Sequence, residues 1–596
     1  MKDISKQIQN LSPEQRKVFE EKLKKAGVDI GKYTKAEEDT RYTEIPSVEE
    51  KEYYDVSAAQ KRMYVINKMS EAGITYNIPS ATLIEGRLDR DKLEKAFTTL
   101  VERHEAFRTS FKLVDGEPVQ VIHGEVEFSP QKIRVEENNV DDIIKDFIRP
   151  FDLGEAPLLR VAFVEISSDR HMLLYDMPHI VSDGVSISIV LKELTALYNE
   201  ESLPKLRIQY KDFSEWQKKL FKSDTMKKQK EYWVNMFSGD IPILNMPEDY
   251  PRQLEQSFEG ETLTFEADRE LLSKVKDIAE EYKSTIFMVF LAAYNVLLNK
   301  YTGQEDIVVG TPIAGRRNKD LQNIVGMFTN TLALRNYPEK DKTFKEFLEE
   351  VKQSSLDSFE NQDYPFEDLV EEIDIKRDLA RNPLFDTMFV LQNISMKEVE
   401  LKGLTFKPYN TNTGISKFDI MLQVFESQDG FAMVWEYCSK LFKKKTIERF
   451  AEHYINILKE VVQNPEMKLS QIEMISKKEK DQILVEFNDT KKEYPRDTTV
   501  HELFVKNAHR TPENIAVECG EERIKYGEFD RKSDCIAKVL RDKGIGKDNV
   551  VGIITERRIE MMVGIMGILK AGGAYLPINP NLPQDRINYM LDDSGV

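Results

Sequence analysis

A strand-length apolar run that passes through a proline into a helix is the feature that most constrains the fold of this chain. Residues 172–177 are mostly apolar and of strand length. Pro178 cannot continue a central strand because it has no N–H to donate. Asp183-Gly184 is a turn dipeptide whose glycine can adopt a positive φ without steric cost. Apolar residues then recur at helical spacing, at Ile187, Val190, Leu191, Leu194 and Tyr198. Residues 178–184 are therefore predicted to connect a strand to a helix in an α/β unit.

The predicted connection carries a histidine. His179 lies beside the apolar strand and four residues before the carboxylate of Asp183. A loop histidine in such a position can act as a general base near neutral pH. The alternative is a histidine that only makes structural hydrogen bonds. The local sequence alone does not decide between these two interpretations.

Length and composition predict a multidomain globular protein. A chain of 596 residues is too long for one hydrophobic core, and its 40% apolar and 32% charged residues are typical of globular proteins. The net charge of −19 argues against nucleic acid or an anionic membrane as the principal partner. Three widely spaced cysteines give neither a disulfide framework nor a zinc site, and no metal site is predicted. They are Cys438, Cys519 and Cys535.

The chain carries no recognisable targeting segment. Its first fifteen residues are polar and lack the apolar stretch of a secretory signal. The most membrane-like run, residues 561–569, is far too short to span a bilayer and is followed by Lys570. A cytoplasmic location without membrane contact is therefore expected. Residues 12–15, Ser-Pro-Glu-Gln, predict the start of a short helix that either packs on the following domain or docks a partner.

Strand and helix patterns alternate in two halves of similar size, which predicts a two-lobed α/β architecture. Seven motifs follow one another along these halves. They are SAAQKRM (57–63), RHEAFRTSF (103–111), MPHIVSDG (177–184), YKDFSEWQ (210–217), VGMFTNTLALR (325–335), NQDYPFE (361–367) and RDLARNPLF (377–385). In this order they resemble the condensation domain of nonribosomal peptide synthetases, over about residues 53–476. Seven collinear matches favour the functional interpretation of His179.

The resemblance extends beyond this region. IKYGEFDRKS (524–533) and LKAGGAYLPINP (569–580) resemble the first two adenylation motifs. The implied fold has two chloramphenicol-acetyltransferase-like lobes in a V shape, with a tunnel through it, followed by a truncated α/β adenylation segment. The implied segments are a leader and linker (1–51), an N-lobe (52–225), a C-lobe (226–475), a linker (476–495) and the adenylation part (496–596). The sequence stops before the family's phosphate loop and lysine, so no adenylation activity is expected.

The resemblance implies peptide-bond formation between two substrates that arrive as thioesters on the phosphopantetheine arms of donor and acceptor carrier proteins. The chain itself would bind no cofactor. An upstream synthetase subunit could dock on residues 1–34. The Ser-Asp-Gly-Val-Ser sequence is similar to members that take an L-configured donor. Two alternatives are a catalytically silent domain that binds or spaces carriers, and an epimerising domain, which is disfavoured because Ile187 follows Ser186.

The same resemblance assigns roles to residues of the loop. His179 matches the histidine used at the reaction centre, whereas Pro178 replaces the preceding histidine of the family pattern. Asp183 matches a structural aspartate that pairs with an arginine, and direct proton transfer by Asp183 is the alternative. The candidate arginines are Arg62 and Arg335. Gly184 is expected to permit the turn. Ser182 and Asn330 are candidates for the tunnel lining.

Overall fold

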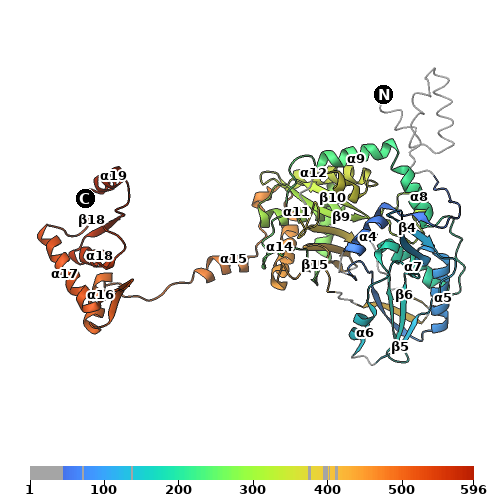
Figure 1. Cartoon of the computed structure of the whole chain (residues 1–596), viewed down its shortest axis with the longest axis horizontal. Helices are drawn as coiled ribbons and strands as arrows, with labels where there is room; N and C mark the ends of the chain where they lie inside the picture. Colours follow the sequence, from blue (N-terminus) through green and yellow to red (C-terminus); the bar gives the residue numbers. More distant parts are fainter. Residues whose placement is uncertain are drawn as a thin grey trace, which may run out of the picture. The chain divides into compact units, whose positions relative to one another are not determined.

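The structure is a computed structural model that describes residues 44–69, 73–135, 139–373, 378–392, 400–401, 403–409, 414–427 and 429–596. The chain divides into two compact units, residues 1–480 and 481–596 (Figure 1). The predicted helix after Ser12 and the proposed docking segment 1–34 lie outside the described residues. In the part of the chain that is described, no helix is both long and apolar enough to cross a membrane.

A six-stranded sheet organises the first lobe of the first unit. All neighbouring strands are antiparallel except β5 and β6, which are parallel. The strands, in spatial order, are β12 (Glu400–Leu401), β13 (Leu404–Tyr409), β2 (Ser80–Gly86), β7 (Arg170–Asp176), β6 (Arg160–Glu165) and β5 (Gln131–Arg134). A smaller sheet contains β1 (Tyr54–Asp55), β4 (Glu117–Ile122) and β3 (Thr109–Val114). The short turn η2 (Glu105–Arg108) precedes β3.

The central strand β7 is buried on both faces. Leu173 and Tyr175 pack on one face with α5 (Arg90–Arg103) and α7 (Gly184–Tyr198), whereas Met172 and Leu174 pack on the other face with α6 (Val140–Phe147). Side chains alternate between faces along a strand, so an unbroken apolar run is expected where both faces are covered. Packing on both faces therefore fixes the position of β7 and of the residues that directly follow it.

The first lobe contains two strands from the second half of the chain. β13 pairs antiparallel with β2 along six residues, Leu404–Tyr409 against Ala81–Gly86, and β12 pairs with β13. The predicted division, with all of residues 226–475 in the second lobe, does not hold for this segment. The edge of β2 is paired with a strand that lies more than 300 residues later in the chain, and local sequence patterns do not predict such a pairing.

A second six-stranded sheet organises the second lobe. β9–β11 and β11–β14 are parallel pairs, and the other pairs are antiparallel. The strands, in spatial order, are β10 (Asn330–Asn336), β9 (Ile307–Ile313), β11 (Thr387–Gln392), β14 (Ile420–Glu426), β15 (Gly430–Cys438) and β8 (Gly260–Asp268). The apolar helix α11 (Ile286–Thr302) is buried without interruption from Met288 to Leu298, at the centre of the largest hydrophobic core.

Further helices surround α11 and the sheet. They are α9 (Asp224–Met236), α10 (Arg269–Glu281), α12 (Phe344–Glu360), α13 (Phe366–Glu372) and α14 (Lys444–Gln463). Short turns occur at η5 (Lys319–Leu321) and η6 (Leu469–Gln471). The two-lobed mixed α/β fold predicted from the sequence is thus confirmed, and Figure 1 shows the two lobes beside each other.

An aromatic cluster joins the two lobes. Tyr210 and Phe213 of α8 (Tyr210–Leu220) pack against Phe328, which precedes β10, with ring centroids 4.7–4.9 Å from that of Phe328. Gly326 allows this approach, because a Cβ there would lie 1.9 Å from the Tyr210 ring. Both rings of α8 are buried at this contact.

The second unit is a smaller α/β assembly. β16 (Ile515–Cys519) and β17 (Glu522–Lys525) form an antiparallel pair, and β18 (Val550–Ile554) and β19 (Ala574–Ile578) form a parallel pair. The helices are α16 (Val500–Arg510), α17 (Tyr526–Asp542), α18 (Ile559–Ala571) and α19 (Gln584–Ser594). α15 (Lys477–Leu484) spans the boundary between the units in the sequence, and η7 (Glu486–Asn488) follows it.

Candidate active site

The predicted strand-to-helix connection is present and is held by its backbone. β7 ends at Asp176, and the turn η4 (His179–Val181) leads to α7. Pro178 is extended, with φ −76°, and forms an isolated bridge with Asn77. The backbone N–H of His179 donates to the carbonyl of Tyr76 at 2.7 Å. Pro178 has no N–H to donate, and the backbone hydrogen bond of the next residue, His179, holds the connection in place.

The His179 side chain lines one pocket and contacts a residue that lines another. It is half-buried and lines a pocket together with Met63, Tyr76 and Asn77. Its Nδ1 lies 3.1 Å from the Sδ atom of Met327. Met327 lines a different pocket, bordered by α4 (Ala58–Met69), α8 and the start of β10. The Met327 sulfur thus connects the imidazole to the second pocket.

The pKa of His179 is lowered to about 4. Burial is the main cause, the nearby Lys417 ammonium adds to it, and the carboxylate of Asp183 opposes it. The imidazole is therefore neutral throughout the physiological pH range and can accept a proton. It is a weaker base than the near-neutral one expected from the sequence.

Asp183 is paired with an arginine and caps α7. It is fully buried and caps α7, accepting hydrogen bonds from the Ser186 N–H at 2.7 Å and from the Phe328 N–H at 3.0 Å. Its arginine partner is Arg316, whose guanidinium lies 3.0 and 3.2 Å from the two carboxylate oxygens. Arg316 also donates to the carbonyls of Leu321 and Ile324 and lies over the Phe328 ring.

The predicted arginine candidates for Asp183 were wrong. Arg62 of α4 pairs with Glu367 of α13 at 2.8 Å, and Arg335 of β10 pairs with Asp306 at 2.7 Å. Each of these two guanidinium groups is paired with another carboxylate. The arginine that pairs with Asp183 comes instead from the Gly-Arg-Arg turn after β9, residues 315–317. Arg62 still belongs to the surroundings of the site, because α4 packs against η4.

Gly184 does not serve as the left-handed turn residue that the sequence suggested. It is the first residue of α7 and is exposed, and its φ is not in the positive region. The turn is made instead by Asp183 as a helix N-cap. A Cβ at Gly184 would meet no atom within 4 Å, so open space lies in front of the N-terminus of α7.

The two predicted tunnel residues occupy different environments. Ser182 is fully buried, and its hydroxyl has no hydrogen-bond partner within the described residues. Because Ser182 is fully buried, the structure does not support the prediction that it lines a tunnel. Asn330 lines the larger pocket, but its amide holds the NQDYPFE loop by donating to the carbonyls of Gln362 and Tyr364 and accepting from the Phe366 N–H.

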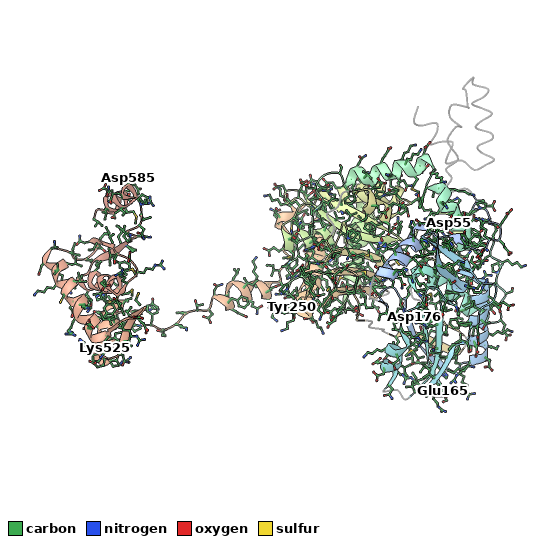
Figure 2. All side chains as sticks on the ribbon, in the orientation of Figure 1. Asp55, Glu165, Asp176, Tyr250, Lys525 and Asp585 are labelled. Carbon is green, nitrogen blue, oxygen red and sulfur yellow. The ribbon has the colours of Figure 1, made fainter. Side chains whose placement is uncertain are left out.

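Asp176, at the end of β7 (Figure 2), is a buried carboxylate that the sequence analysis did not single out. One oxygen accepts from Asn77 at 2.8 Å and lies 3.4 Å from Arg160, and the other has no partner within the described residues. Burial raises its pKa to about 6, against the opposing effects of Arg160 and Asn77. Because the unfolded carboxyl titrates near 3.9, ionised Asp176 destabilises the fold above pH 6, and this cost decreases as the pH falls.

Replacing Asp176 with asparagine is therefore expected to remove a pH-dependent contribution. Between pH 7 and pH 5, wild type should gain about 1 kcal/mol of unfolding free energy relative to Asp176→Asn. Urea unfolding followed by tryptophan fluorescence measures this, because Trp216, Trp233 and Trp435 all lie in the first unit. A constant difference between the two proteins over this pH range would contradict the pKa assignment.

Comparison with protein families assigns most of the chain. The family model "Condensation domain" matches residues 50–484, and the model "AMP-binding enzyme" matches residues 504–596. The chain belongs to the condensation-domain family. The suspected resemblance to a condensation domain followed by the start of an adenylation domain is thereby confirmed. In the part of the chain that the structure describes, no group of three or more side chains could hold a metal ion.

Curated relatives of this condensation-domain protein are long synthetases. Gramicidin S synthase 2 of Brevibacillus brevis is 51% identical over 568 residues, which are 95% of this chain and 13% of the relative. Tyrocidine synthase 3 of Brevibacillus parabrevis is 51% identical over 93% of this chain and 9% of the relative. Bacitracin synthase 3 of Bacillus licheniformis is 47% identical over 95% and 9%. The chain thus spans about a tenth of the length of these relatives.

Solved structures share the fold. A holo four-domain nonribosomal peptide synthetase bound to AMP and glycine has a TM-score of 0.81 and 23% identity, covering 93% of this chain and 44% of that one. The condensation domain of a monacolin K polyketide synthase has a TM-score of 0.64 and 22% identity, covering 71% of this chain and all of that one. At these identities, the likeness concerns the fold alone.

Proposed function

We propose that the condensation part of this chain forms a peptide bond between an acceptor aminoacyl group and a donor acyl or peptidyl group, each held as a thioester on the phosphopantetheine arm of a carrier protein. The observation that carries this proposal is that His179 lines one pocket and contacts, through Nδ1, the Met327 sulfur, which belongs to the lining of a second pocket. Each pocket would admit one arm, and the substrates would meet at the imidazole.

In the proposed reaction, the acceptor nitrogen attacks the thioester carbonyl carbon. The C–N bond forms, the C–S bond breaks, and the donor carrier's thiol leaves. The nitrogen must lose one proton, and the leaving sulfur takes one up. Neutral His179 can orient the amine, accept the proton from the attacking nitrogen and return it to the thiolate.

A weak base is sufficient for this role. The thioester is already activated, and the nitrogen becomes far more acidic once it has bonded to the carbonyl carbon. Much of the rate then comes from holding the amine and the carbonyl in attack geometry. Direct transfer is favoured over an acyl-enzyme, because the hydroxyl nearest in sequence, that of Ser182, is fully buried.

A silent, carrier-binding domain is the second candidate function. It is favoured by Pro178 in place of the first histidine and by the low basicity of His179. Incubating the chain with loaded donor and acceptor carriers separates the two functions. Dipeptidyl acceptor carrier should accumulate above the enzyme-free control, as measured by mass spectrometry of the intact carriers. Binding of both carriers without product above that control would identify the silent domain.

A further inference from the structure

A lysine from the second lobe is held against the His179 loop. Lys417 lies in the segment that enters β14, and side chains fix both of its backbone polar groups. Its carbonyl accepts hydrogen bonds from the side-chain amides of Gln256 and Asn382, each at 3.1 Å. Its N–H donates to a carboxylate oxygen of Glu436 at 3.3 Å. The position of the Lys417 backbone is therefore tightly determined.

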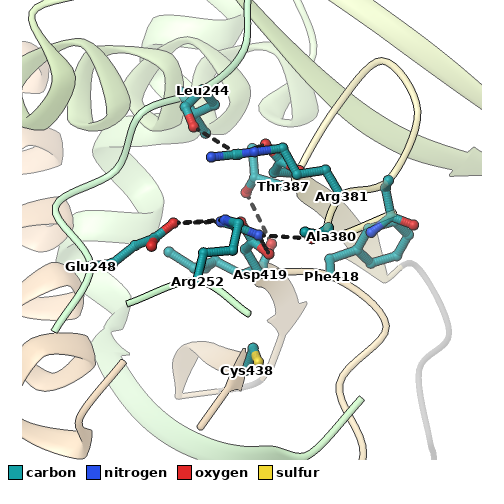
Figure 3. A network of polar contacts seen from close by, with 12 residues as sticks. Leu244, Glu248, Arg252, Ala380, Arg381, Thr387, Phe418, Asp419 and Cys438 are labelled. Atoms are coloured by element: carbon teal, nitrogen blue, oxygen red, sulfur yellow. Dashed lines mark hydrogen bonds and ion pairs between the residues drawn. The ribbon is translucent and has the colours of Figure 1, made fainter. Parts of the chain in front are cut away.

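An ion network next to Lys417 strengthens this hold (Figure 3). Asp419, two residues further on, receives both terminal nitrogens of Arg252, which also pairs with Glu248. The Asp419 N–H donates to the carbonyl of Asp386 at 3.0 Å, and the Asp386 carboxylate pairs with Arg381. Breaking a buried pair of this kind by removing one partner is costly, so the segment resists displacement.

The side chain of Lys417 crosses to the first lobe. Its Nζ lies 4.9 Å from the centroid of the Tyr76 ring, and the carbonyl of Tyr76 accepts the His179 N–H. Within the described residues, no carboxylate lies within salt-bridge distance of Nζ. The ammonium is thus held over Tyr76, a residue that lines the same pocket as His179.

The charged groups that act on His179 and Lys417 come from both lobes. His179 faces the Lys417 ammonium and the Asp183 carboxylate, which is already paired with Arg316. Burial lowers the pKa of Lys417 below its ordinary value; the Glu436 carboxylate opposes this, and the Arg62 guanidinium adds to it. Burial lowers the pKa of His179 most, and Lys417 lowers it further. The Lys417 charge, which comes from the second lobe, therefore disfavours the protonated form of the imidazole.

We propose that Lys417 is a positioning residue that sets the charge state of the reaction chamber, holding His179 in its neutral form. For the acceptor, the inference rests on the proposed function: a cation beside the bound amine disfavours its ammonium form, and only the free amine is a nucleophile. The same charge favours the negative oxygen that develops when the amine attacks the thioester carbonyl.

Histidine titration tests the inference without any turnover. The full chain is labelled with ¹³C-histidine, and His179→Gln identifies the His179 signal among the seven histidines. In wild type the signal should remain that of a neutral imidazole down to pH 5. In Lys417→Met the midpoint should rise by about one pH unit, whereas Lys417→Arg should resemble wild type. Lys417→Gln, which also removes the charge, serves if the methionine variant does not fold.

Lys440→Met is the matched control, because Lys440 lies in the same lobe but pairs with Glu259 at 3.1 Å. It should leave the His179 midpoint unchanged. In the carrier assay, the acid limb of the pH–rate profile should move to higher pH with Lys417→Met. Equal midpoints in wild type and both charge-removing variants would overturn the inference, leaving Lys417 as a strut between the lobes. A shifted midpoint in a chain that transfers nothing would overturn the proposed function alone.

Discussion

Replacing Asp183 with alanine is expected to lower the free energy of unfolding of the first unit by about 3–5 kcal/mol. The change leaves Arg316 as an uncompensated charge that is only 7% exposed. It also removes the N-cap of α7 and the acceptor for the Phe328 N–H. Urea unfolding followed by tryptophan fluorescence measures the loss, since all three tryptophans belong to this unit.

Two further variants sharpen this prediction. Removing both charges, in Asp183→Ala with Arg316→Met, should be less destabilising than Asp183→Ala alone, because no unpaired charge remains buried. Glu117→Ala is the control for an exposed pair, since Glu117 and Lys61 are both solvent-exposed, and it should cost less than about 1 kcal/mol. Similar losses for Glu117→Ala and Asp183→Ala would contradict the structural importance of the buried pair.

Replacing His179 with alanine is expected to slow transfer between loaded carriers by about 10²–10⁴-fold, the usual contribution of a positioned general base. Single-turnover formation of dipeptidyl acceptor carrier measures this loss. The affinity for either carrier should change little, because His179 lines the interior of a pocket rather than an exposed surface.

His123→Ala is the matched histidine control. His123 hydrogen-bonds to Ser110 in the small sheet and lines neither pocket beside His179, so its loss should leave the transfer rate near that of wild type. A loss of less than about tenfold in His179→Ala would indicate that substrate positioning alone supplies the rate. In that case, His179 would not act as the general base.

The fold could be predicted from the sequence wherever a local pattern determines the structure. The apolar run before Pro178 is buried on both faces, as two-sided packing requires, and the helix that follows begins where Asp183 caps it. The predicted conformation of Gly184 was wrong because an Asp-Gly pair fits two local structures, a left-handed turn and a helix N-cap. The helix that follows favours the second.

The candidate site could be predicted only in part, because its partners come from distant parts of the chain. The family motifs indicate His179 and Asp183, but Arg316 lies 133 residues from Asp183, and charge alone does not distinguish it from Arg62 or Arg335. Met327 stands within one of the seven motifs, whereas Lys417 belongs to none of them. Lys417 of the second lobe lies over Tyr76 of the first lobe, and no local sequence pattern predicts that contact.

The pairing of β13 with β2 limits how synthetases of this family can be recombined. A junction placed between the lobes would exchange residues 226–475 as a block and bring foreign β12 and β13 segments to a host β2 edge. A mismatched segment would expose an unpaired strand, which invites aggregation between molecules. A chimaera that keeps residues 400–409 with the host's own first lobe preserves the original six-stranded sheet.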